Sequence, residues 1–255
     1  MRVTFLGTGT SHGVPMIGCD CATCRSADVR DRRLRPSVLL ELDGLNVLVD
    51  AGPDLREQAL RHRIARVDLI LFTHGHADHI LGMDDVRRFN AIQQSAMPCY
   101  GDATTLQDVR RMFWYVFDPG TSKGGGIPHL ELFEIAGDFC VGAAVIEPIP
   151  LWHGKRRILG FRIGRFAYLT DCSTIPDESW TRLQDLDVLV LDALRDRPHP
   201  THFTLAEAVA AARRIGARRT LFTHMCHDLP HEPTNARLPD DMRLAYDGLV
   251  VDIQH

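Results

Sequence analysis

The stretch 74–79 reads His-Gly-His-Ala-Asp-His and so concentrates four potential metal ligands in six positions. Imidazole is the commonest protein ligand of zinc and similar metals, and a carboxylate adds an oxygen ligand beside the nitrogens. An apolar, β-prone run comes directly before the stretch, which therefore lies where a buried strand ends and a loop begins. We predict a metal site that includes His74, His76, Asp78 and His79.

Three further residues of ligand type, His153, Asp171 and His224, each follow a predicted strand. With the first four they make seven potential ligands, which is too many for one zinc ion with an open position. Seven ligands suit two ions held about 3.5–4 Å apart. Asp171 has the chemistry to bridge them, because a carboxylate can bind one metal ion with each oxygen.

The order of apolar runs and turn residues shows which elements must position these ligands. A chain of 255 residues with this pattern is long enough for one large α/β domain. Predicted strands cover 3–6, 38–42, 45–49, 67–72, 97–100, 130–135, 144–150, 158–163, 166–169, 188–191 and 219–222. Predicted helices cover 54–63, 85–93, 104–117 and 204–215, and the last one opens with a capping box at Thr204 and Glu207. We expect His153 in the loop between the strands 144–150 and 158–163.

The tetrapeptide Leu-Phe-Thr-His occurs twice, at 71–74 and at 221–224, each time at the end of a predicted strand. Two strands that present a histidine at the same kind of end suggest two similar halves that meet at one site. No linker separates the halves, so we predict a single domain over 1–255. Asp50 and Thr73 are candidate hydrogen-bond partners for the histidines.

The composition limits the partners and the compartment that we expect. The net charge of −4 and the absence of a long basic arm argue against a nucleic-acid partner. No apolar run approaches the roughly 18 residues of a membrane helix, and the first residues lack the apolar core of a signal peptide. The cysteine pattern indicates a metal site in a reducing compartment. We therefore expect a cytoplasmic protein that acts on a small substrate.

Three of the seven cysteines form the cluster Cys19-x-Cys21-x-x-Cys24. Thiolates at this spacing suit tetrahedral zinc, and a closed structural site needs a fourth ligand from elsewhere in the chain. Three free buried thiols are the alternative interpretation.

Two segments carry no ligand in this interpretation. The charge run 30–35 is typical of a solvated loop. The glycine-rich run 118–128 is typical of a surface loop, and it could equally serve as a lid or as the edge of a dimer interface.

The signature at 74–79, followed by later His, Asp and His ligands in that order, resembles the metallo-β-lactamase fold superfamily. The resemblance implies a four-layer αβ/βα sandwich with its site at one edge of the two sheets. It implies that His74, His76 and His153 hold the first ion. The second ion would be held by Asp78, His79 and His224, and both ions by Asp171.

A narrower resemblance rests on Gly-Thr-Gly at 7–9, Gly-Val-Pro at 13–15, the cysteine cluster and His224-x-x-His227. These motifs, spread over essentially the whole chain, are similar to those of the PhnP-type phosphodiesterases, which hydrolyse the 1,2-cyclic phosphate of phosphoribose. The resemblance implies a homodimer. It also implies a structural zinc ion held by Cys19, Cys21, Cys24 and His227, with Cys226 as a rival fourth ligand on sequence alone.

The same family places a histidine close to the metals, just before a capped helix, as a general acid. His202, ahead of the capping box, matches that position. A helix N-terminus attracts a phosphate while a nearby imidazole can protonate the leaving oxygen. The alternative is that His202 begins the helix and contacts only solvent.

The resemblance predicts a hydrolase that cleaves small phosphodiesters, such as cyclic ribose phosphates, with a hydroxide that bridges two divalent ions, Zn or Mn. Asp78 would orient the nucleophile and His202 would protonate the leaving group. One alternative is a tRNA 3′-processing endonuclease, whose helix-opening histidine motif resembles residues 202–208. The other is a PqqB-like metal-binding protein without hydrolase activity, although such relatives have a degraded histidine cluster.

Overall fold

The strands of the computed structural model, which describes residues 1–122 and 126–253, form two seven-stranded mixed sheets. The order in the first sheet is β14-β1-β2-β3-β4-β5-β6, and in the second it is β13-β12-β11-β10-β9-β8-β7. Each half of the chain therefore builds one sheet, except that the last strand returns to pair with the first. The strands are β1 Arg2–Gly7, β2 Ser37–Leu42, β3 Leu45–Val49, β4 Leu69–Leu71, β5 Met97–Gly101, β6 Leu130–Glu134, β7 Phe139–Val141, β8 Ala144–His153, β9 Arg156–Ile163, β10 Phe166–Leu169, β11 Val188–Asp192, β12 Arg219–Thr223, β13 Met242–Leu244 and β14 Val250–Asp252.

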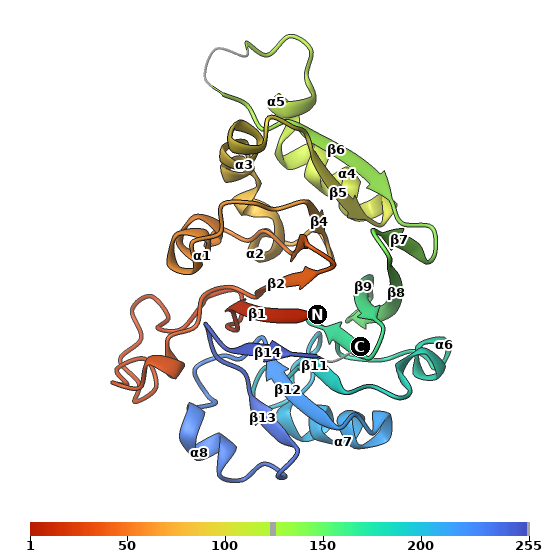
Figure 1. Ribbon diagram of the computed structural model, residues 1–255. Helices are drawn as coiled ribbons and strands as arrows, with labels where there is room; N and C mark the ends of the chain where they lie inside the picture. Colours follow the sequence, from red (N-terminus) through yellow and green to blue (C-terminus); the bar gives the residue numbers. More distant parts are fainter. Residues whose placement is uncertain (123–125, 254–255) are drawn as a thin grey trace.

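The helices lie on the two outer sides of the paired sheets, so that helix, sheet, sheet and helix form four layers (Figure 1). None of the helices in the described part of the chain has the length and apolar character that a membrane span needs. The helices are α1 Leu55–His62, α2 Ala77–Ile80, α3 Val86–Gln93, α4 Ala103–Met112, α5 Trp114–Phe117, α6 Asp177–Trp180, α7 Leu205–Ile215 and α8 His231–Asn235, with 3₁₀ turns at Val29–Asp31, Leu81–Asp85 and Thr181–Leu183.

Three hydrophobic cores hold these layers together. In β2, Val38 and Leu40 point into a core shared with the second sheet, whereas Leu39 points to the helices α1, α3 and α4. The third core lies between the second sheet and α7, where Leu205 and Ala212 pack. Both faces of each sheet are thus covered, which explains why the strands read as continuous apolar runs.

The glycines at 7 and 9 permit the close backbone contact that the turn after β1 makes with residues 33–35. A Cβ on Gly7 would collide with the backbone carbonyl of Arg35, and one on Gly9 would lie 2.8 Å from that of Arg33. The charge run at 30–35 was predicted to be a solvated loop, and this prediction is wrong. Arg33 is only 1% exposed, and Asp31 is also buried.

The predicted strands and helices are present, with three differences. The helix predicted over 104–117 is broken at Phe113, whose φ of −108° and ψ of 39° lie outside the helical region. β8 continues through Pro150 to His153, which is therefore the last residue of a strand and not a loop residue. At residues 147–151 β9 alone pairs with β8 within the described part of the chain, so the nitrogens of Pro148 and Pro150 face an open edge. Finally, the sequence did not predict the short elements α2, β7 and α6, nor α8, β13 and β14, which follow the strand expected to be the last.

Part of the glycine-rich run 118–128 falls on residues 123–125, which lie outside the described residues. The lid and dimer-edge interpretations of this run therefore stay predictions.

Candidate metal centre

The seven predicted ligands come together at one edge of the two sheets, as two groups of potential ligand atoms. His74, His76 and Asp78 with His79 follow β4 of the first sheet, which is the strand predicted to present them. The others lie at the ends of β8, β10 and β12 in the second sheet. The two groups, each with its ligand atoms within 4.8 Å of one another, are His74, His76 and His153, and Asp78, His79, Asp171 and His224.

Asp171 lies between the two groups. Its carboxylate oxygens are 3.3 Å from His79 Nε2 and 3.0 Å from His224 Nε2, and one of them is 3.9 Å from His74 Nε2. Two ligands that sit about 2.1 Å from a tetrahedral metal ion are about 3.4 Å apart. The observed spacings therefore fit atoms that share an ion, with Asp171 placed to contact both ions.

The buried ring nitrogens provide a direct test of this fit. The Nε2 atoms of His74, His79 and His224 are buried and have no hydrogen-bond partner among the described residues. A buried polar nitrogen without a partner costs free energy, so native proteins rarely contain one unless another group binds it. Three such atoms aimed at the same carboxylates are well explained by bound cations.

The Nδ1 atoms of His74, His79 and His153 are held by the protein, which fixes the orientation of these rings. His79 Nδ1 lies 2.7 Å from Asp50 Oδ2, and His74 Nδ1 lies 3.0 Å from Thr73 Oγ1, which itself donates to Asp50. His153 Nδ1 lies 2.8 Å from the carbonyl of Thr201, which can only accept. With the proton on Nδ1, each Nε2 lone pair is free to bind a metal. The structure thus places Asp50 and Thr73 as the sequence predicted.

The pKa values indicate how strongly this cluster attracts positive charge. Burial lowers the pKa of His79, but Asp171 and Asp78 outweigh it and hold that pKa well above its usual value. Burial likewise lowers the pKa of His224, which Asp171 nevertheless raises to about 10. Burial and the neighbouring His79 hold the pKa of His74 well below its usual value. Divalent cations can supply the charge that protons on His79 and His224 otherwise provide.

Three residues at this edge adopt left-handed backbone conformations, which non-glycine residues rarely do. The φ angles are 62° at Asp50, 58° at Asp171 and 61° at His224. Each residue lies just beyond a strand, where the chain must turn sharply to direct its side chain into the site. Strain of this kind collects at functional sites, because the surrounding fold compensates for it.

His202, the predicted general acid, contacts both groups of ligands. Its ring stacks on that of His224, with centroids 4.6 Å apart, and meets His153 edge to face at the same distance. Its Nδ1 lies 3.1 Å from Asp192 Oδ1, and Asp192 also accepts from the backbone nitrogen of Phe203. His202 is buried and therefore is not a helix-start residue that contacts only solvent.

Asp192 was missed as a site residue in the sequence, although its position at the end of a buried strand resembles that of Asp50. That pattern could have identified it. Asp192 Oδ1 is 3.1 Å from His202 Nδ1 and 3.6 Å from His224 Nδ1, so one carboxylate faces a predicted acid and a predicted ligand.

The cysteine cluster forms a separate group with a C-terminal histidine. His227 Nδ1 lies 3.2, 3.6 and 3.5 Å from the sulfurs of Cys19, Cys21 and Cys24. In a tetrahedral zinc site a thiolate sulfur and an imidazole nitrogen are about 3.5 Å apart. The structure brings His227 and not Cys226 to the three thiols, because the Cys226 sulfur accepts a hydrogen bond from the backbone nitrogen of Asp228.

The buried Arg33 attaches the loop that carries His227 to the N-terminal segment. Its guanidinium donates to the carbonyls of Cys226 and Leu229, at 2.9 and 2.6 Å, and pairs with Asp31 at 3.3 Å. These contacts hold His227 beside thiols that lie far away in the sequence.

Comparison with known families shows the class of protein. The family model described as "Beta-lactamase superfamily domain" matches residues 45–225. The chain therefore belongs to the β-lactamase superfamily and has its metallo-hydrolase fold, which confirms the predicted four-layer sandwich.

Individual relatives narrow the comparison. A crystal structure of "a new diphosphatase from the PhnP family" is 47% identical, with a TM-score of 0.93, and the match covers 99% of this chain and 98% of that one. The predicted resemblance to PhnP-type proteins is thus confirmed. An octanoyltransferase of Porphyromonas gingivalis is 38% identical over 98% of this chain, but the match spans only 51% of that protein. Zinc-bound PqqB from Methylobacterium extorquens is 18% identical over 99% of this chain and 100% of its own, with a TM-score of 0.80, and shares the fold.

Proposed function

We propose that the chain is a metal-dependent phosphodiesterase that cleaves small phosphodiesters, such as cyclic ribose phosphates, at the edge of the two sheets. The observation that carries this proposal is the pair of ligand groups that share Asp171, with three buried Nε2 atoms left without partners. The similarity to a PhnP-family diphosphatase supports cleavage of a phosphate-containing bond.

In this proposal His74, His76 and His153 hold one divalent ion, and Asp78, His79 and His224 hold the second, with Asp171 on both. Two ions, Zn or Mn, would supply charge neutralisation at the phosphoryl oxygens and a water of lowered pKa.

The protein's own groups bind and orient the substrate and move the protons. Asp78 Oδ2 lies 3.4 Å from His79 Nε2 and 3.6 Å from His224 Nε2, so its carboxylate is directed toward the reacting centre and can orient an attacking water. His202 keeps its Nδ1 proton on Asp192, which leaves Nε2 to donate a second proton to the leaving oxygen. The burial of both groups limits competition from bulk water.

A substrate panel on protein of defined metal content tests the proposal. The panel contains cyclic ribose phosphates, cyclic nucleotides, bis-aryl phosphates, a nucleoside diphosphate, and thioesters or lactones. We expect the diesters to be hydrolysed, and we expect Asp78→Ala and His202→Ala to abolish most of that turnover. His129→Ala, which removes an exposed imidazole far from the ligands in the sequence, serves as the control. Full activity in Asp78→Ala would refute the assignment.

Metal analysis and a tRNA-binding assay separate the alternatives. A chain that retains zinc on Cys19, Cys21, Cys24 and His227 but holds no ion at the histidine groups would be a non-catalytic, PqqB-like protein. A strongly salt-dependent complex with tRNA would instead favour the tRNA-processing function. Homodimer formation and a cytoplasmic location are further parts of the proposal, which size-exclusion chromatography and fractionation can test.

A further inference from the structure

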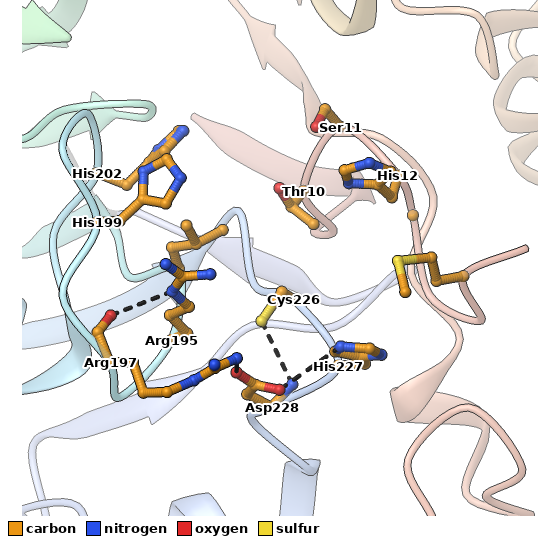
Figure 2. Close-up of a pocket in the computed structure, with 13 residues that line it drawn as sticks. Thr10, Ser11, His12, Arg195, Arg197, His199, His202, Cys226, His227 and Asp228 are labelled. Atoms are coloured by element: carbon orange, nitrogen blue, oxygen red, sulfur yellow. Dashed lines mark hydrogen bonds and ion pairs between the residues drawn. The ribbon is translucent and has the colours of Figure 1, made fainter. Parts of the chain in front are cut away.

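A groove of about 440 Å³ lies between the helices α1 and α3, on the outer side of the first sheet (Figure 1). The cavity beside His202 in Figure 2, whose wall includes His199 and His12, is a separate one, because the two hollows share no lining residue. None of the proposed metal ligands lines the groove. A molecule can therefore bind in the groove without entering the reaction site.

The floor of the groove is apolar. Leu55 and Phe89 form its buried part, whereas Leu60 and Ile92 are 63% and 48% exposed. Leu60 lies on α1 and Ile92 on α3, so each helix contributes a large exposed apolar side chain to the same groove. Apolar residues that are exposed singly need no explanation, but several of them in one concave site mark a place where another molecule binds.

Three arginines, Arg56, Arg63 and Arg88, also line the groove. Their side chains form no hydrogen bond or ion pair with any of residues 1–122 and 126–253. Asp85 supplies a single carboxylate to the lining, so three arginines against one aspartate leave an excess of two positive charges. This excess is local, because the chain as a whole has a net charge of −4.

Neighbouring arginines that point away from the groove are treated differently. Arg61 of α1 is paired with Glu57 at 2.9 Å, and Arg87 of α3 is paired with Asp84 at 3.0 Å. The chain thus supplies acidic partners to the arginines beside the groove and none to the arginines that line it. Acidic groups of another molecule can pair with the arginines of the lining.

The spacing of the three arginines indicates what kind of molecule this is. Arg56 and Arg63 are seven residues apart, or about 10 Å along α1 and the residue that ends it, while Arg88 belongs to the opposite helix. A small molecule with one carboxylate cannot pair with all three. A helix with apolar residues at i, i+3, i+4 and i+7 and acidic residues beside them can, because its apolar stripe fits a groove between two helices.

A second copy of the chain fits the groove poorly. In a symmetric dimer the same patch of both copies meets, so the unpaired arginines of one copy would lie close to those of the other. Like charges brought together in an interface oppose association, whereas opposite charges favour it. A partner that carries acidic residues is therefore the better match.

We propose that the groove between α1 and α3 binds an acidic amphipathic helix of a partner protein. The apolar stripe of that helix packs against Leu60 and Ile92, and its carboxylates pair with Arg56, Arg63 and Arg88. Since these pairs are exposed, salt weakens the complex. The docking surface does not depend on the reaction that the metal centre catalyses.

Two synthetic peptides test the charge requirement on the metal-loaded protein. The first is a helix with leucines at i, i+3, i+4 and i+7 and glutamates on the rest of its surface, and the second has lysines in place of the glutamates. Calorimetry measures the Kd of each. Three exposed ion pairs predict that the glutamate peptide binds at least about tenfold more tightly, and that this preference shrinks as salt is added.

A triple variant tests where the glutamate peptide binds. Arg56→Gln, Arg63→Gln and Arg88→Gln together should raise its Kd about 5- to 100-fold. Ile92→Glu should also raise the Kd, because it places a charge on the apolar floor. The matched control lowers the net charge equally by changing three exposed arginines elsewhere, and it should leave the Kd within about twofold. The control substitutions are Arg111→Gln, Arg213→Gln and Arg219→Gln.

Four results would overturn the proposal. Equal binding of the two peptides would show that the groove does not select acidic partners, and an equal loss in the control variant would show that only net charge matters. Decanoate that binds where the glutamate peptide does not would instead assign the groove to a small amphipathic anion. A dimer of the chain that Ile92→Glu dissociates would assign it to a second copy.

Discussion

Replacing Asp50 by asparagine should weaken metal binding at the second group of ligands, although Asp50 itself contacts no metal in our assignment. Its carboxylate is fully buried and accepts from Thr73 through both the backbone nitrogen, at 2.9 Å, and the hydroxyl, at 2.8 Å. It also faces His79 Nδ1 at 2.7 Å. Three donors therefore converge on two oxygens, and an asparagine amide has only one oxygen to offer.

Each orientation of the asparagine amide leaves a conflict. If its NH₂ group replaces Oδ2, it faces the Thr73 hydroxyl and His79, and if it replaces Oδ1, it faces the Thr73 backbone nitrogen. A buried donor without an acceptor costs about 1–3 kcal/mol. His79 can avoid this cost by moving its proton to Nε2, but that tautomer points a proton at the metal. Asparagine tolerates the left-handed backbone of Asp50 as well as aspartate does, so backbone strain adds little.

Metal content after dialysis against a graded series of chelator concentrations measures the effect. Loss of such a buried partner typically lowers metal affinity 10- to 100-fold, so Asp50→Asn should lose ions at about 10- to 100-fold lower free chelator strength than the wild-type protein. Zinc at the proposed cysteine site should be unaffected, and Asp252→Asn, at an exposed carboxylate paired with Arg2, should behave as wild type. Wild-type metal retention in Asp50→Asn, with an unchanged free energy of unfolding, would refute this reasoning.

Three further predictions concern the rest of the fold. Arg33→Met should destabilise the protein by about 3–5 kcal/mol, because it leaves Asp31 buried without its partner, and should release zinc from the cysteine cluster more readily. Urea unfolding measures the loss of stability, and a colorimetric assay measures the release of zinc. Wild-type zinc retention would show that the loop does not need Arg33. Burial, then Arg30 and Arg33, lowers the pKa of His231 to about 4, so the unfolded chain binds a proton first as the pH falls below about 6.5. The contribution of His231 to the free energy of unfolding is complete above that pH. About 2 kcal/mol should be lost by pH 5 in the wild-type protein but not in His231→Gln. Parallel curves of stability against pH for the two proteins would contradict this prediction. Thr204→Ala removes the hydroxyl that accepts from the backbone nitrogen of Glu207 and donates to the Glu207 carboxylate. It should cost about 1 kcal/mol in thermal unfolding, an effect that a wild-type Tm would exclude.

The sequence predicted where the candidate ligands lie because each one carries a local signal. Strand ends are marked by apolar runs, and parallel strands such as β10, β11 and β12 bring their carboxyl ends to one edge without further information. Asp171 and His224 follow two of these strands, so their type and position were sufficient. The capping box that places His202 is equally local, and it is present.

The residues that the sequence did not reveal depend on contacts between distant segments. Arg33 reads as part of a charged loop, and only its contacts with Cys226 and Leu229 explain its burial. No glycine or proline marks the break between α4 and α5 at Phe113. The Phe113 side chain is buried, and its packing decides where the helix ends.

Neither half of the chain contains a complete set of ligands. His74 and His76 come from the first sheet and are completed by His153 of the second, while His79 is completed by Asp171 and His224. In folding terms, the proposed ions would bind tightly only after both sheets have docked, and they would then act as cross-links between segments that are far apart in the sequence. The metal supply of the cell would therefore govern how long the two halves stay closed against proteases, as well as how fast the site turns over.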